Sequence, residues 1–363
     1  MSAAPTISRA QADAARRVLV INVTRIGDTL LATPALRGIS QFFPQARLTC
    51  LGHPKRVEVV QHLPYLAKVG GITKRHALYR GWGDVLRGPE YDWAFVWGED
   101  AALVRYALRK ARHVVAARQR DAALNAKLFA AVDLPHRPDV HAVAWTLALP
   151  QAVGIPVRDY RLDYVVTAAE AEAARARLRQ DGVIADGNGP LIGMQVASFP
   201  TKPYRDWPIA QFTQLAKRIL AQWPRAQFLL YGSADDRTRV AQLVAELPGH
   251  ATSFAGKLTL RETVAVMSAT DLYIGVDTGP THLFSALQKP MVVLYHPALP
   301  SGKFRPLQHA ALHAIDHPHV GPDADEKMPI GEIGVDRVFA AVCDALAGKP
   351  STRPGLPAVG LVE

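Results

Sequence analysis

Hydrophobic residues in the first half of the chain gather in short runs that alternate with segments of helical spacing. Runs rich in Val, Ile, Leu and aromatic residues are typical of strands covered on both faces. The strands predicted in this way are 18–23, 47–51, 93–97 and 113–116. A helix is predicted over 34–43, where apolar residues recur at helical spacing until Pro44. Strands that alternate with helices indicate a parallel sheet with helical crossovers.

The second half repeats this pattern after an interruption at 149–166, where prolines and glycines break the rhythm. A helix rich in Ala, Arg and Glu is predicted over 168–180. Further strands are predicted at 191–196, 227–231, 272–276 and 291–295, and further helices at 209–222, 237–246, 260–267 and 282–287. The chain is therefore predicted to be α/β, with two Rossmann-like domains in tandem.

The boundaries of these domains follow from the same pattern. We expect a flexible N-terminus at 1–16, a first domain at 17–165 and a second at 166–334. A last helix at 335–347 is expected to pack back toward the N-terminal domain, and the Pro/Gly-rich tail at 348–363 to be loose. Ligands of such sheets bind outside the carboxyl ends of the strands, so we expect a site in a cleft between two facing sheets.

The composition is that of a globular protein, since 49% of the 363 residues are hydrophobic and 20% are charged. No apolar run is long enough to span a bilayer, and the first 17 residues lack the apolar core of a signal peptide. We therefore expect a cytoplasmic protein. Cys50 and Cys343 have no metal or redox spacing and are expected to be small buried residues.

The formal net charge of +10 predicts an anionic partner. Nucleic acid is disfavoured because no basic helix, RNA-binding aromatic signature or zinc pattern appears. An anionic membrane surface and a phosphorylated substrate both fit. Neither domain has Gly-x-Gly-x-x-Gly after its first strand, which disfavours dinucleotide redox chemistry. The histidines at 309, 313, 317 and 319 lack Cys or acidic residues at metal spacing and are predicted to form a surface loop without a metal.

The segment from Asp277 to His282 carries the strongest chemical signal. A predicted strand ends in Asp277, and a turn with Thr278, Gly279 and Thr281 leads into a helix that contains His282. Helix N-termini present unpaired N–H groups, so such a turn suits a phosphate. The alternative is a simple strand–helix turn in which Asp277 caps the helix.

A second carboxylate, Asp28, follows the first strand and one glycine. A carboxylate at that edge of a sheet is suited to act as general base on a sugar hydroxyl. The alternative is again a helix-capping aspartate. The sequence pattern alone leaves both open.

The second domain has further polar candidates after its strands. Lys202 and Arg205 are suited to neutralise a diphosphate, although a solvated loop is the alternative; Trp207 before the next helix favours an anchored loop. Asp236 follows the strand at 227–231, where a carboxylate can bind ribose hydroxyls, while Ser233 or Asp235 there caps the next helix in the alternative interpretation. Leu258 suits contact with a base or a place in the core.

Taken together, residues 17–345 resemble the ADP-heptose:lipopolysaccharide heptosyltransferases, glycosyltransferase family nine. The resemblance rests on three segments that occur in the family order. They are Arg25-Ile-Gly27-Asp28-Thr-Leu-Leu-Ala-Thr-Pro34, Tyr204-Arg205-Asp-Trp207-Pro208 and Val276-Asp277-Thr-Gly-Pro-Thr-His282.

This resemblance implies a GT-B fold and an inverting, metal-independent transfer from ADP-heptose to a lipopolysaccharide core sugar or lipid-linked acceptor. It implies no cofactor, and peripheral contact with the inner face of the inner membrane. The first domain would hold the acceptor, with Asp28 as the base, and the second the nucleotide sugar. The implied donor-binding residues are Lys202, Arg205, Asp236, Leu258, Asp277, Thr278, Gly279, Thr281 and His282. The implied acceptor-binding residues are Thr24, Arg25, Gly27, Arg118 and Arg120.

Several alternatives stay open at this point. Arg118 and Arg120 also fit a solvated surface. A transferase of the same family that uses another sugar or acceptor is one alternative. A sugar-nucleotide epimerase of GT-B type is a rival, and it needs acid and base groups on both sides of the donor sugar. A catalytically silent nucleotide-sugar-binding protein is a third possibility, disfavoured by the joint presence of Asp28, Arg205 and the Asp277 turn.

Overall fold

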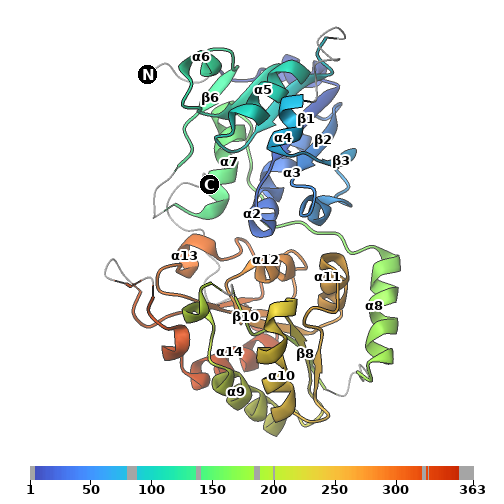
Figure 1. Ribbon diagram of the computed structural model, residues 1–363, viewed down its shortest axis with the longest axis vertical. Coiled ribbons are helices and arrows are strands. Elements are labelled where there is room, and N and C mark those ends of the chain that lie inside the picture. The colour runs from blue at the N-terminus through green and yellow to red at the C-terminus, as the bar shows by residue number, and fades with distance from the viewer. Residues whose placement is uncertain are drawn as a thin grey trace. The chain divides into compact units, whose positions relative to one another are not determined.

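The computed structural model describes residues 5–79, 88–135, 140–183, 189–198, 201–320, 324–325 and 327–350. The chain divides after Val165 into two units, each built on one six-stranded parallel sheet (Figure 1). The predicted α/β class with two Rossmann-like domains is confirmed. The predicted loose tail lies outside the described residues from 351 onward.

The sheet of the first unit has the strand order β3-β2-β1-β4-β5-β6, which is typical of Rossmann folds. Its strands are β1 (Arg17–Asn22), β2 (Arg47–Gly52), β3 (Lys68–Gly71), β4 (Tyr91–Val96), β5 (Ala111–Ala117) and β6 (Ala130–Val132). The order reverses between β1 and β4, so their carboxyl ends form the switch point at which ligands of such sheets bind.

Helices of the first unit pack on the two faces of this sheet. They are α1 (Arg9–Ala14), α2 (Ile26–Leu31), α3 (Thr33–Phe42), α4 (Lys74–Tyr79), α5 (Ala101–Lys110), α6 (Ala122–Asn125) and α7 (Ala142–Ala152). Successive residues of β4 show the alternation between faces. Ala94 belongs to one apolar core with Leu103 of α5, whereas the Phe95 ring packs against Phe43 at the end of α3.

The N-terminal segment differs from the expected flexible one, because residues 9–14 form α1. Ser8 accepts a hydrogen bond from the backbone N–H of Gln11, and the Gln11 side chain accepts one from the Ser8 backbone, which completes a capping box. Ile7 and Ala12 are buried, and the Ile7 N–H donates to the carbonyl of Val153. These contacts order a segment whose composition alone predicts no structure.

The second unit repeats the same topology, with the order β12-β11-β10-β7-β8-β9. Its strands are β7 (Leu191–Gln195), β8 (Gln227–Tyr231), β9 (Ala251–Ser253), β10 (Leu272–Val276), β11 (Met291–Tyr295) and β12 (Leu312–Asp316). Counted from β7, this is again the order 3-2-1-4-5-6. The switch point of the second unit therefore lies between β7 and β10.

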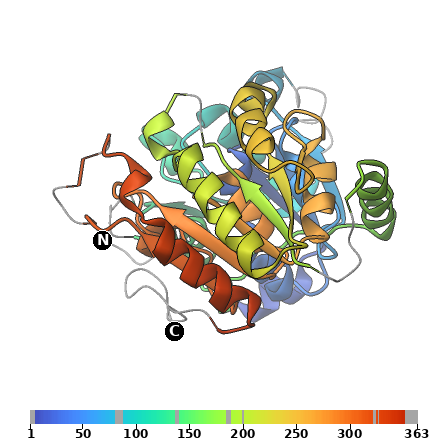
Figure 2. The ribbon, with the colours of Figure 1, turned by 90° about the horizontal axis from the view of Figure 1, so that it is seen from below.

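Helices of the second unit form two layers. They are α8 (Ala168–Gln180), α9 (Ile209–Gln222), α10 (Arg237–Glu246), α11 (Leu260–Ser268), α12 (Gly279–Ser285), α13 (Ser301–Phe304) and α14 (Val335–Leu346). Residues of α9, α10 and α14 share one core, and residues of α8, α11 and α12 share the other. Figure 2 shows α14 alongside α9 on the same face of the sheet.

The helix α14 contributes to the core of the second unit, and its expected packing toward the N-terminal domain stays a prediction. Its apolar stripe of Val335, Val338, Val342 and Ala345 is buried in the core of the second unit. This spacing covers one helix face, and the sheet beneath α9 offers the matching apolar surface. Cys343, on the same helix, is half-buried, whereas Cys50 is buried as predicted.

Sequence patterns predicted the central strands of both sheets but none of the four outer ones. The missed strands are β3, β6, β9 and β12, which form the edges of the two sheets. The histidine cluster lies in and around β12, one of these missed strands. His313 lies within β12, and His309, His313 and His317 are buried, so the predicted surface loop is wrong for all but His319. Pairing of β12 with β11 buries this segment despite its polar composition.

Candidate functional site

The switch point of the second unit brings together three buried polar side chains. Arg205 ends a 3₁₀ turn (Pro203–Arg205) after β7, Asp277 directly follows β10, and His282 lies in α12. The Arg205 Nη2 donates to the Asp277 carbonyl at 3.2 Å and lies 3.7 Å from the Asp277 Oδ2. His282 Nε2 lies 3.8 Å from the other carboxylate oxygen. Residues distant in sequence thus meet where a Rossmann sheet binds its ligand.

The loop that carries Arg205 is fixed by its neighbours. Trp207 is fully buried, donates from Nε1 to the Ile333 carbonyl at 2.9 Å and packs edge-on against Phe212. The Asp206 Oδ1 accepts a hydrogen bond from the Ser198 N–H at 2.6 Å. This is the anchored loop that Trp207 predicts, and it presents Arg205 in one position.

Burial sets the protonation of the site. It raises the pKa of Asp277 to about 7, although the Arg205 charge opposes this shift. It lowers the pKa of His282 to about 4, so the imidazole is neutral at physiological pH. Among the described residues, Asp277 Oδ1 and His282 Nδ1 have no hydrogen-bond partner. Buried polar atoms of this kind are poised to be satisfied by a polar ligand.

The turn after Asp277 distinguishes the two interpretations of this segment. Thr278, not Asp277, is the N-cap residue of α12, so the alternative that Asp277 caps this helix is wrong. The Thr281 hydroxyl is fully buried and bonds the Val276 carbonyl at 2.6 Å and the Tyr273 hydroxyl at 3.0 Å. The Thr278 hydroxyl donates to the same Val276 carbonyl at 3.3 Å. These hydroxyls hold the turn that positions Asp277, and Gly279 begins the helix.

The remaining donor-side candidates are less buried. Asp236 is half-buried, and its Oδ2 accepts from the N–H and hydroxyl of Ser233, at 2.7 and 2.8 Å, in a capping box. Asp236 therefore completes a capping box in which Ser233 is the N-cap residue of the 3₁₀ turn Ala234–Asp236. Leu258 is half-buried and packs against the core that contains α11. Lys202 is half-buried and directly precedes the turn with Arg205.

In the first unit, Asp28 lies in the first turn of α2, three residues after the N-cap Arg25. Its exposed carboxylate accepts a hydrogen bond from the Arg25 backbone N–H. Partial loss of water around the carboxyl raises its pKa, while this bond and the charges of Arg25 and Arg56 oppose the rise. Asp28 thus supports its helix without being the N-cap, and it stays accessible.

The residues around Asp28 are tied by short polar contacts. The Thr24 and Thr29 hydroxyls lie 3.2 Å apart, and the Thr29 hydroxyl donates to the Arg25 carbonyl at 2.8 Å. Arg56 donates to the Thr24 carbonyl at 3.1 Å. Thr24 and Gly27 are half-buried, and Arg25 is exposed. The structure therefore gathers the predicted Thr24, Arg25, Gly27 and Asp28 at the carboxyl end of β1.

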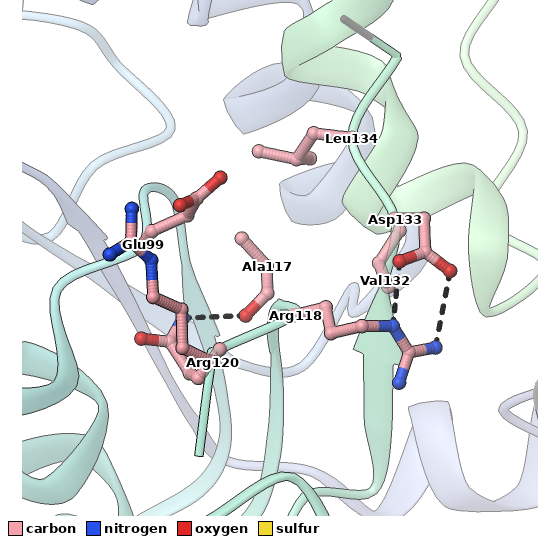
Figure 3. Close-up of a pocket in the computed structure, with 8 residues that line it drawn as sticks. Glu99, Ala117, Arg118, Arg120, Val132, Asp133 and Leu134 are labelled. Atoms are coloured by element: carbon pink, nitrogen blue, oxygen red, sulfur yellow. Dashed lines mark hydrogen bonds and ion pairs between the residues drawn. The ribbon is translucent and has the colours of Figure 1, made fainter. Parts of the chain in front are cut away.

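Arg118 and Arg120 line a pocket of about 270 Å³ at the carboxyl ends of β4, β5 and β6 (Figure 3). Arg118 forms a two-point ion pair with Asp133, at 2.6 and 3.1 Å. Arg120 is exposed and has no ion-pair partner among the described residues. The simple solvated-surface interpretation is thus incomplete, because both arginines border a cavity.

Sequence reasoning missed the other residues of this pocket, among them Glu99, Gln119 and Asp133. Glu99 follows β4 and Asp133 follows β6. Such residues can be found from their position just after a strand. Asp133 could not be found in this way because β6 was not predicted.

A third polar cluster joins His317 and His319 to Glu332 in the second unit, with ligand-type atoms within 4.8 Å of one another. His319 Nδ1 lies 3.0 Å from Glu332. The His317 Nδ1 accepts a hydrogen bond from the His319 N–H at 3.1 Å, and the His317 Nε2 lies 3.9 Å from the same Glu332 oxygen. The fold thus brings to the histidines an acidic side chain that their spacing in the sequence does not indicate.

Two Rossmann-like units in tandem, each with polar side chains at its switch point, are the architecture of the GT-B fold, which family 9 structures share. The family model for glycosyltransferase family 9 (heptosyltransferase) matches residues 83–332, and the chain belongs to this family. The resemblance noted in the sequence is thereby confirmed.

Individual relatives agree. Lipopolysaccharide heptosyltransferase 1 of Pseudomonas aeruginosa is 27% identical, over 78% of this chain and 79% of that protein. Lipopolysaccharide heptosyltransferase 2 of Salmonella typhimurium is 32% identical, but the match spans only 34% of this chain and 35% of the relative.

Solved structures support the fold. The glycosyl transferase family 9 protein from Veillonella parvula superposes with a TM-score of 0.79 at 17% identity, covering 93% of this chain and 99% of that one. ADP-heptose lps heptosyltransferase II of Escherichia coli gives 0.73 at 20% identity, covering 92% and 99%.

Proposed function

We propose that this protein transfers heptose from ADP-heptose to a sugar of the lipopolysaccharide inner core, with inversion at the anomeric carbon and without a metal. The observation that carries the proposal is the buried group of Arg205, Asp277 and His282 at a Rossmann switch point of a family 9 chain. The names of the curated relatives and a solved Escherichia coli heptosyltransferase WaaC with ADP support the donor and the acceptor class.

In the proposed reaction, the Asp28 carboxylate removes the proton of the attacked acceptor hydroxyl. The oxygen then attacks the anomeric carbon, and the bond from that carbon to the diphosphate oxygen breaks, so that ADP leaves with the bonding electrons. The raised pKa of Asp28 favours this role, because a more basic carboxylate accepts a proton more readily. The position of Asp28 at the carboxyl end of β1 keeps it open to a large acceptor.

Arg205 and Lys202 are proposed to neutralise the diphosphate as negative charge develops on it. Fixed cationic donors stabilise the transition state because they need no reorganisation. The unpartnered Asp277 Oδ1 is then satisfied by a heptose hydroxyl, and neutral His282 donates or accepts beside it. Gly279 admits close approach of the ligand to the backbone.

Other donor contacts follow the family pattern. Asp236 is proposed to bind the ribose through the carboxylate oxygen not used by Ser233, and Leu258 to contact the adenine. Thr278 and Thr281 are proposed to act by holding the turn, since their hydroxyls already bond the Val276 carbonyl. Thr24, Arg25 and Gly27 remain the proposed acceptor contacts around the base.

We also propose that the enzyme works at the cytoplasmic face of the inner membrane, where a net charge of +10 favours contact with anionic lipid. Within the described ranges, no helix has the length and apolarity needed to cross a bilayer.

The test is incubation of the protein with ADP-heptose and a core acceptor isolated from heptose-deficient cells. We expect release of ADP and a mass increase of one heptose on the glycan. Isomerised sugar nucleotide formed without acceptor would support the epimerase instead, and binding without turnover would support a silent protein. Transfer only from a different sugar nucleotide would keep the class and correct the donor.

A further inference from the structure

The pocket of the first unit contains a buried hydrogen-bond acceptor that none of the described residues satisfies. Gln119 lines this pocket and is only 5% exposed. Its Oε1 is buried and has no hydrogen-bond partner among the described residues. A buried acceptor without a donor is costly and uncommon in folded proteins.

The orientation of the Gln119 amide is fixed by two carbonyl groups. Its Nε2 donates to the Ala117 carbonyl at 2.6 Å and to the Gly98 carbonyl at 3.3 Å. A flipped amide would place Oε1 against both carbonyl oxygens, and acceptors that face each other repel. The atom without a hydrogen-bond partner is therefore Oε1 and not Nε2.

The main chain at Gln119 is held as firmly as its side chain. The Gln119 N–H donates to Asn125 Oδ1 at 2.8 Å, and Asn125 Nδ2 donates back to the Gln119 carbonyl at 2.7 Å. Both ends of the residue are thus immobilised before any ligand arrives. A preorganised acceptor loses little conformational entropy on binding.

The charges around the pocket indicate which kind of ligand would supply a hydrogen-bond donor to Gln119 Oε1. Arg118 is neutralised by Asp133, and the Glu99 carboxylate at the same pocket has an interaction of its own. Arg120 has no ion-pair partner among the described residues. Arg120 is therefore the cation that these residues leave unpaired, and it lies at the same pocket as one unfilled acceptor. A sugar that carries hydroxyl groups near an anionic group matches both.

Strand order locates the pocket relative to the proposed base. β4 lies between β1, which precedes Asp28, and β5, which precedes Gln119. With neighbouring strands about 4.8 Å apart, the carboxyl ends of β1 and β5 are separated by roughly 10 Å. This is more than the width of one sugar ring, so a ligand at Gln119 is not the ring attacked at Asp28.

We infer that Gln119 is a specificity-determining residue whose Oε1 accepts a hydrogen bond from a hydroxyl of an acidic sugar next to the glycosylated one, with Arg120 beside the anionic group of that sugar. This inference rests on the proposed function. A site built to pair with a hydroxyl discriminates strongly against an analogue that lacks it, because the buried acceptor then stays unpaired.

The experiment measures kcat/KM for the full acceptor saccharide and for synthetic analogues that each lack one hydroxyl on the adjacent sugar. In the wild-type protein, one analogue is expected to lose roughly 10- to 100-fold. Gln119→Met removes the acceptor atom, so the full acceptor and that analogue should then differ by less than about threefold. A merely structural effect of the substitution would lower both values equally and leave their ratio unchanged.

A second variant guards against loss of folding, because Gln119→Met also removes the donors to Ala117 and Gly98. Gln119→Lys keeps donors for both carbonyls but has no acceptor, and it should abolish the discrimination in the same way. Gln41→Met, at an exposed glutamine of α3, is the matched control and should retain it.

The outcomes separate the two hypotheses. If the wild-type protein transfers heptose but treats all the analogues alike, or if both Gln119 variants keep the wild-type ratio, this inference is wrong and the proposed function stands. If no acceptor is glycosylated by the wild-type protein, both are wrong.

Discussion

The two sheets share one strand order, yet their switch points differ in burial. In the second unit, Arg205 and Asp277 are each 8% exposed, and His282 is 6% exposed. In the first unit, Asp28 stands at the surface at the equivalent strand end. A nucleotide donor of constant structure suits a buried, fixed site, whereas a large saccharide needs an open one. We therefore expect changes in the first unit to affect turnover and changes in the second to affect donor affinity.

The largest effect is expected from Asp28→Asn, which keeps the size of the side chain and an acceptor for the Arg25 N–H but removes the base. Turnover should fall by about 10³-fold, within the range known for general bases. ADP affinity, measured by calorimetry, should stay unchanged because the proposed donor site lies in the other unit. Asp13→Asn, at an exposed carboxylate of α1, is the control. Near-normal turnover of the Asp28 variant would show that the base is another group.

A smaller effect is expected from Arg205→Gln, and it concerns ADP affinity instead of turnover. This change removes the charge proposed to bind the diphosphate, and charge-assisted hydrogen bonds contribute about 1.5–3 kcal/mol. ADP affinity should fall by roughly 10- to 100-fold. Arg225→Gln, at an exposed arginine before β8, serves as the control. Unchanged ADP affinity would move the diphosphate role to Lys202.

The third prediction concerns the stability of the buried site. The folded-state pKa of Asp277, about 7, exceeds the ordinary value of 3.8, so the folded protein binds this proton more tightly than the unfolded chain. This stabilising contribution is present at low pH and is lost as pH rises through about 7. Asp277→Asn removes the titration, so between pH 5 and 8 the wild-type protein should lose roughly 2 kcal/mol relative to the variant.

Urea unfolding of both proteins at the two pH values measures this difference. Asp336→Asn is the control, because that carboxylate on α14 has a 93% exposed side chain. His282 titrates at lower pH, near 4, and is retained in both proteins. Parallel pH profiles for the wild-type protein and the Asp277 variant would mean that Asp277 does not change its charge in this range.

Central strands were predictable from sequence because both of their faces are covered, which requires continuous apolar runs such as 272–276. Edge strands lack this requirement. β3 contains two glycines, and β12 contains His313, yet each completes a sheet by pairing with one neighbour. Such pairing depends on long-range contacts that no local pattern records.

The candidate sites show the same limit. Asp277 and Arg205 were found because each follows a predictable strand or precedes a marked helix. Gln119 carries no sequence signal of its own, since its importance lies in an amide oxygen that has no hydrogen-bond partner among the described residues. Asp133 was missed together with the edge strand β6 before it.

Among the described residues, the chain passes from one unit to the other only once, after Val165, and α14 belongs to the core of the second unit. A genetic crossover at this junction exchanges a whole sheet without separating any strand from its neighbours. Chimeras joined at 165/166 would therefore test the proposed division of labour, in which the first unit selects the acceptor and the second binds the donor.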